Sequence, residues 1–173
     1  MNDANERRLV INAEFQALLL RLIEHVPVFA GLTPHELQEL LGNAERKRFA
    51  AGQSIMQQGD SGRFMCVLID GQATVSKQES GHFTRHEIGM LGRGDCFGEM
   101  AIVDPAPRSA TIDAVTDCLL IRIQESDCWR NPVIASKIYR NIAVILAQRL
   151  RDTQELLIQR DLPAPANSAG LAS

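Results

Sequence analysis

The sequence of 173 residues lacks several features that define specialised classes of protein. No apolar run approaches the ~20 residues that span a bilayer. Residues 1–8 are polar and charged, with no signal-like cleavage site after them, so we expect a cytoplasmic protein. The net charge is −3, which excludes an overall basic field that would attract nucleic acid.

Cysteine and histidine are too few and too scattered to predict a metal centre. No Cys-x-x-Cys spacing occurs, and lone histidines are far more often structural than metal ligands. Cys66 and Cys118 lie in apolar, strand-like segments and are expected in the core. Ser54, Ser61 and Ser76 have no histidine at a spacing that suggests a catalytic pair, so the sequence predicts no enzyme and no cofactor.

What is present is typical of a globular protein with one domain. Apolar residues make up 45% and charged residues 23%. The pattern of apolar residues divides the chain into N-terminal helices over 1–44, a strand-rich region over 45–123, C-terminal helices over 124–160 and a disordered tail over 161–173.

The helical segments carry recognisable end signals. Apolar residues at helical spacing predict a first helix that ends near Pro27. Thr33, followed by Pro34 and by Glu36, predicts a capping box at the start of a short second helix. Pro132 is placed to begin a long helix reaching about residue 160, and Trp129 before it is expected to pack between that helix and the strands.

The middle region alternates short apolar runs with glycine turns, such as Asp70-Gly71. The basic run at 46–48 is expected on a solvated strand edge. Periodicity alone leaves a barrel, a sandwich and a roll open. The predicted strands are 54–57, 64–69, 73–76, 83–88 and 109–123.

The segment from Phe97 to Thr111 contains the most informative motif, Phe-Gly-Glu-Met-Ala followed by Pro-Arg-Ser-Ala. Its Glu99 would accept hydrogen bonds from sugar hydroxyls, and its Arg108 would fork onto phosphate oxygens, which together suit a sugar phosphate. One helical turn is expected over 100–103. The alternative interpretation is a surface ion pair between Glu99 and Arg108, worth about 0–1 kcal/mol.

This motif resembles the phosphate-binding cassette of cyclic-nucleotide-binding domains. The resemblance covers roughly residues 28–158, and the long helix is similar to the dimer helix of bacterial regulators of the catabolite-activator type. It implies an α+β fold: an antiparallel, jelly-roll-like β-roll of about eight strands with N-terminal helices and a long C-terminal helix.

The resemblance also implies roles for individual residues. Glu99 would accept from the ribose 2′-hydroxyl, backbone N–H groups near Ala101 and the Arg108 side chain would bind the cyclic phosphate, and Ser109 would add a hydroxyl donor. Two strand residues would pack on the sugar or base. The full predicted ligand-binding set is Val75, Ile88, Gly98, Glu99, Met100, Ala101, Arg108, Ser109 and Ala110.

These expectations combine into a stand-alone sensor that binds cyclic AMP in preference to cyclic GMP and signals to a partner protein through its helices. The long helix permits a homodimer. Only 13 residues follow Arg160, too few for a helix-turn-helix module, so no DNA binding is expected. The alternatives are a β-roll that acts only as a dimerisation scaffold, or one that binds a cyclic dinucleotide.

Overall fold

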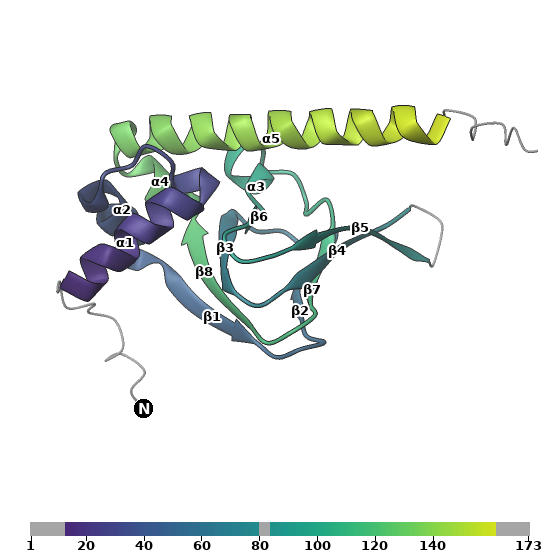
Figure 1. Ribbon diagram of the computed structural model, residues 1–173, viewed down its shortest axis with the longest axis horizontal. Coiled ribbons are helices and arrows are strands. Elements are labelled where there is room, and N and C mark those ends of the chain that lie inside the picture. Colours follow the sequence, from purple (N-terminus) through teal and green to yellow (C-terminus); the bar gives the residue numbers. More distant parts are fainter. Residues whose placement is uncertain (1–12, 80–83, 162–173) are drawn as a thin grey trace, which may run out of the picture.

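The computed structural model describes residues 13–79 and 84–161, which form a β-roll with helices at one end and along one side (Figure 1). The tail predicted over 161–173 lies outside the described residues, apart from Asp161. The long helix α5 runs across the roll, and the remaining helices of the two flanking regions gather at the end where α5 begins. The helices are α1 (Ala13–His25), η1 (Pro27–Phe29), α2 (Pro34–Leu40), η2 (Leu41–Asn43), α3 (Met100–Val103), α4 (Glu125–Trp129) and α5 (Pro132–Asp161).

Two four-stranded antiparallel sheets make the roll, in the orders β1-β8-β3-β6 and β2-β7-β4-β5. In these orders the chain crosses between the two sheets and does not form a simple meander. The arrangement confirms the predicted antiparallel roll. The strands are β1 (Glu45–Phe49), β2 (Ser54–Met56), β3 (Phe64–Asp70), β4 (Ala73–Gln78), β5 (Arg85–Leu91), β6 (Cys96–Phe97), β7 (Thr111–Ala114) and β8 (Cys118–Gln124).

Turn chemistry explains where several strands end. Gly71, between β3 and β4, has φ +96, and a Cβ there would meet Cys118 Sγ at 2.9 Å, so the hairpin needs glycine. The predicted single strand over 109–123 is wrong: Val115 to Asp117 form a turn that separates β7 from β8. The Thr116 hydroxyl accepts from Gln72 N at 2.9 Å, which fixes this turn without glycine or proline.

The basic run at 46–48 lies in β1, an edge strand of its sheet, with Arg46 and Arg48 exposed.

The predicted capping box is confirmed: the Thr33 hydroxyl accepts from Glu36 N at 3.2 Å, and the Glu36 carboxylate accepts from Thr33 N at 2.7 Å. All four cysteines are buried free thiols. Trp129 is 56% exposed, and its ring contacts that of Tyr139 at a tilt of 40°, so its predicted packing between roll and helix is wrong.

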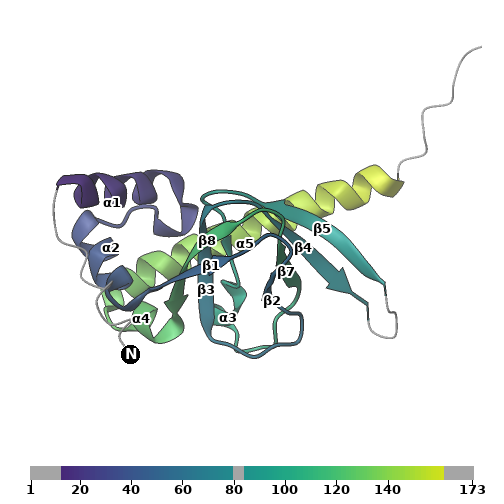
Figure 2. The ribbon, with the colours of Figure 1, turned by 90° about the horizontal axis from the view of Figure 1, so that it is seen from below.

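The first half of α5 is firmly attached to the rest of the molecule. Ile134, Ile138 and Ile142 are buried in a cluster that also contains residues of α1, η1, α2 and β3. Asn141, 4% exposed, donates to the backbone oxygens of Val28 at 3.0 Å and Ala30 at 2.8 Å. The second half of α5 extends past the roll on the side of β4 and β5, as the view from below shows (Figure 2).

Candidate functional site

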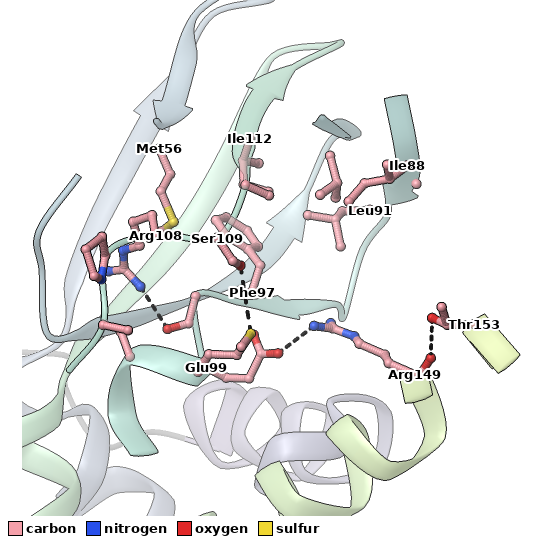
Figure 3. A pocket seen from close by; sticks show the side chains of 18 of the residues that line it. Met56, Ile88, Leu91, Phe97, Glu99, Arg108, Ser109, Ile112, Arg149 and Thr153 are labelled. Atoms are coloured by element: carbon pink, nitrogen blue, oxygen red, sulfur yellow. Dashed lines mark hydrogen bonds and ion pairs between the residues drawn. The ribbon is translucent and has the colours of Figure 1, made fainter. Parts of the chain in front are cut away.

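A cavity of about 540 Å³ opens between the roll and the second half of α5. Its volume lies in the range of small-molecule binding sites. Strands β4 and β5, the segment 97–110 and α5 all contribute lining side chains (Figure 3). All nine residues of the predicted ligand-binding set line this one cavity: Val75, Ile88, Gly98, Glu99, Met100, Ala101, Arg108, Ser109 and Ala110.

The segment that forms the floor turns sharply at Gly98, which has φ +70. A Cβ at this position would meet Arg108 Nη1 at 2.8 Å and Met56 Cε at 2.9 Å, so a side chain would displace the guanidinium. The expected helical turn follows as α3, with Glu99 at its N-cap. The Ala101 N–H donates to Gly98 O at 3.3 Å, a long bond that is easily exchanged for a stronger acceptor.

Arg108 is 5% exposed, and neutral groups hold its guanidinium in place. Nη1 donates to Gly98 O at 2.9 Å and Nη2 donates to Phe64 O at 2.8 Å. Burial lowers the pKa of this guanidinium from its usual range, yet an arginine so placed remains charged at neutral pH. Because carbonyl oxygens carry no formal charge, the positive charge of Arg108 remains available to an anion.

Glu99 is 1% exposed and is held from the other side of the cavity by α5. Arg149 Nη1 lies 2.5 Å from Glu99 Oε1, and Nη2 of the same side chain donates to Cys96 O at 2.7 Å. Figure 3 shows Arg149 reaching from its helix toward Glu99. These two contacts of Arg149, called its fork below, join the cassette to the second half of α5 through polar groups.

Glu99 and Arg108 therefore bond to different partners. The alternative interpretation of the sequence, a surface ion pair between these two residues, is wrong: both are buried, and Glu99 pairs with Arg149 instead. One strong acceptor and one strong donor face a common cavity without neutralising each other, which is the arrangement that a polar ligand carrying an anion requires.

The rest of the cavity wall combines apolar side chains with polar groups of α5. Ile88 is 60% exposed and Met90 is 51% exposed, so β5 presents apolar surface with little protein against it. Thr153 faces them from α5, and its hydroxyl donates to Arg149 O at 2.7 Å. The hydroxyl oxygen can still accept a hydrogen bond, because its lone pairs remain. Ser109, at the cavity edge, has its hydroxyl 3.8 Å from Met100 Sδ.

The described part of the chain shows neither a cluster of metal-ligating side chains nor a membrane-spanning helix. No group of three or more His, Cys, Asp or Glu side chains among the described residues could hold a metal ion. None of the described helices is long and apolar enough to cross a membrane.

Burial raises the pKa of the Cys66 thiol, close to Arg108, to about 12, so this group remains a neutral thiol.

Residues 46–130 match the family model of the cyclic nucleotide-binding domain. These residues form a domain of this family. The chain is 33% identical over 130 residues to the cyclic AMP receptor protein of Thermus thermophilus, covering 73% of this chain and 58% of that protein. It is 32% identical over 114 residues to the cAMP-dependent protein kinase regulatory subunit of Mycosarcoma maydis, covering 65% of this chain and 21% of that protein. The chain thus spans little more than half of one relative and about a fifth of the other.

Solved structures agree with this assignment. The crystal structure of the Thermus thermophilus catabolite activator protein superposes with a TM-score of 0.68 at 30% identity, covering 77% of this chain and 62% of that chain. A cyclic nucleotide-binding domain from Methylobacillus flagellatus superposes with a TM-score of 0.74 over 88% of both chains. Its identity is 18%, so this second likeness supports the fold alone.

Among the lining residues that sequence reasoning missed are two polar side chains of α5, Arg149 and Thr153. In the sequence, Arg149 interrupts the apolar stripe of the long helix. The signal was available, since helical spacing puts Arg149 and Thr153 on the same face as the buried Ile138 and Ile142. A polar residue that continues a buried stripe is a candidate to face the interior of a site.

Proposed function

We propose that this cyclic nucleotide-binding domain is a sensor that binds a cyclic mononucleotide in the cavity between the roll and α5, cyclic AMP in preference to cyclic GMP. The observation that carries the proposal is the pair of buried, separately held groups, Glu99 and Arg108, that face this one cavity. Scaffold proteins have no need of two buried charged side chains at an open cavity, because such groups lose hydration.

The phosphate would lie over the cassette. Arg108 supplies a charge-assisted, planar donor, and the first backbone N–H groups of α3, with the Ser109 hydroxyl beside them, add neutral donors. An anion there would attract Arg108 N–H groups that the two carbonyl oxygens leave unused, since a guanidinium has five N–H donors.

The ribose would face Glu99. Arg149 binds Oε1 of this carboxylate, and a carboxylate has about four lone-pair sites, so it can accept from the 2′-hydroxyl while it keeps Arg149. Arg149 then does two things: it orients the acceptor, and it joins the sugar subsite to α5.

The base would extend toward β5 and α5. Val75 and Ile88 offer apolar contact to its faces, and Thr153 offers an acceptor at its edge. Adenine presents an exocyclic amino donor at position 6, where guanine presents a carbonyl acceptor, so an acceptor opposite position 6 supports the preference for cyclic AMP. The names of the similar proteins, a cyclic AMP receptor and cAMP-dependent kinase subunits, support the same preference.

Output would pass through α5 to a partner protein. A ligand can shift the position of this helix only if it binds two arrangements with different affinity. Leu150 and Leu157, each more than half exposed on α5, leave apolar surface for a second copy or another protein. A homodimer through this helix, a separate effector, a cytoplasmic location and the absence of DNA binding stay predictions.

Isothermal titration calorimetry with cyclic AMP, cyclic GMP and cyclic di-GMP tests the proposal. We expect saturable one-to-one binding of cyclic AMP, weaker binding of cyclic GMP and none of cyclic di-GMP. Preference for the dinucleotide would favour a roll adapted to a larger ligand. Absence of heat with all three, confirmed by unchanged melting temperature, would favour the scaffold instead.

Hydrogen exchange should show whether the ligand acts on α5. We expect cyclic AMP to slow exchange in residues 97–110 and also in 145–158, because Arg149 links the two segments, while α1 and β1 stay unchanged and serve as the internal control. Protection restricted to 97–110 would mean that binding does not couple to the helix, and the proposed route of signalling would be wrong.

A further inference from the structure

Behind the cavity, two guanidinium groups lie over one aromatic ring. The guanidinium carbons of Arg108 and Arg122 are each 4.3 Å from the ring centroid of Phe64. Phe64 begins β3, and Arg122 lies on the neighbouring β8, opposite Cys66. Of these residues only Arg108 lines the cavity, so Phe64 and Arg122 support it from inside the roll.

We propose that Phe64 is a positioning residue that holds the Arg108 guanidinium in the orientation that receives the phosphate, and that the charge of Arg122 behind it favours binding of the anion. This inference rests on the proposed function. Phe64 contributes twice: its ring supports the face of the guanidinium, and its backbone oxygen accepts from Nη2 at 2.8 Å. With Gly98 O accepting from Nη1, the planar group is held by one cation–π contact and two hydrogen bonds.

The neighbouring backbone is shaped to leave room for this arrangement. A Cβ on Gly62 would meet the Phe64 ring at 2.7 Å and Arg108 Nη2 at 3.3 Å. A Cβ on Gly98 would meet Arg108 Nη1 at 2.8 Å. Two glycines on separate loops thus border the stack, and a side chain at either would push the guanidinium or the ring aside.

Arg122 adds charge rather than shape. Its Nε is buried and, among the described residues, has no hydrogen-bond partner, which is a costly arrangement for a guanidinium. The positive charge of Arg122 repels that of Arg108 and lowers the pKa of Arg108. The carboxylates of Glu99 and Asp60 attract Arg108 and raise its pKa. A phosphate bound to Arg108 would relieve the repulsion between the two cations. Arg122 therefore favours the state with the anion bound.

The ring is tested by Phe64→Leu, which keeps the backbone oxygen and most of the volume but removes the aromatic face. We expect cyclic AMP affinity to fall about five- to tenfold, and Phe64→Tyr, which keeps the ring, to bind within about twofold of the wild type. Phe49→Leu is the matched control, because it makes the same change in the same hydrophobic cluster at a ring for which the structure describes no guanidinium contact. It should bind as the wild type does.

A double-mutant cycle separates positioning from general support of the fold. In an Arg108→Ala background, Phe64→Leu should cause no further loss, because nothing remains to be positioned. An equal five- to tenfold loss in both backgrounds would overturn the proposal, and so would wild-type affinity in Phe64→Leu.

A measurement without nucleotide keeps the inference independent of the proposed function. The NMR order parameter of the Arg108 Nε–Hε pair should be high in the unliganded wild type and in Phe64→Tyr, and should fall in Phe64→Leu. If the wild type binds no cyclic nucleotide, the proposed function fails while this result still decides whether the ring holds Arg108. An unchanged order parameter in Phe64→Leu would overturn the positioning role.

Arg122→Met tests the charge. We expect about threefold weaker binding of cyclic AMP near 50 mM salt, and a smaller difference near 500 mM, because salt screens the field of Arg122. The loss in Phe64→Leu should not depend on salt. Wild-type affinity of Arg122→Met at low salt would remove Arg122 from the proposal.

Discussion

Arg108→Ala is expected to weaken cyclic AMP binding by about 2–5 kcal/mol, the range measured when one partner of a buried charge-assisted pair is removed. At about 1.4 kcal/mol per tenfold, this corresponds to a loss of roughly 30- to 4000-fold. The reason is that Arg108 is a buried cation at the cassette whose hydrogen bonds, among the described residues, go to the neutral carbonyl oxygens of Gly98 and Phe64, so no carboxylate is bonded to it in place of the ligand. Calorimetry of wild type and variant measures the change.

Two further variants make this result specific. Arg108→Lys keeps the charge but loses the planar fork, so its affinity should lie between those of wild type and Arg108→Ala. Arg85→Ala removes a half-exposed guanidinium of β5 that does not line the cavity, and should bind as the wild type does. Because Arg108→Ala also leaves two backbone oxygens without their donor, its native fold must be verified by circular dichroism. Unchanged affinity in a folded Arg108→Ala protein would remove the site from this cavity.

Glu99→Gln is expected to weaken cyclic AMP binding by about 1–3 kcal/mol, less than Arg108→Ala. The amide still accepts a hydrogen bond from the ribose, but without the charge that strengthens it. Arg149→Gln is the matched variant: it breaks the same ion pair and leaves the carboxylate in place. If Glu99 acts on the sugar directly, Glu99→Gln should cost more than Arg149→Gln.

The 2′-deoxy analogue of cyclic AMP locates the contact. It should bind the wild type more weakly than cyclic AMP, and the difference between the two ligands should shrink in Glu99→Gln, since the hydroxyl and the carboxylate act on each other. Calorimetry of both ligands with both proteins gives the four affinities. An equal difference in wild type and variant would show that Glu99 does not face the sugar.

The sequence predicted those features that depend on neighbours along the chain. The capping box of Thr33 and Glu36 is formed within four residues, and the cassette from Gly98 to Ala110 is one continuous segment. In both cases the residues that interact are close in the sequence, so residue type and spacing carry most of the information.

Features that depend on distant residues were not predicted. Strand β6 has only two residues and exists because Cys96 and Phe97 pair with Val67 and Cys66, some thirty positions earlier. Arg149 meets Glu99 across fifty positions. A two-residue strand is too short to show a periodic pattern, and the sequence around a single arginine on a helix does not indicate its partner. Only the folded roll brings these groups together.

The attachment of α5 at Asn141 gives this helix the geometry of a lever. The amide bonds the helix to Val28 and Ala30, and Ile142, Ile145 and Leu146 pack against the core just beyond it. Farther along, the fork of Arg149 attaches the helix to the cassette. At 1.5 Å of rise per residue, the part of α5 beyond Asn141 is about 30 Å long. A tilt of only about 10° about Asn141 would move its far end by about 5 Å, while a contact at Arg149, less than halfway along this part, would move by about 2 Å. A small displacement at the ligand is thereby enlarged at the end of the helix that a partner would meet.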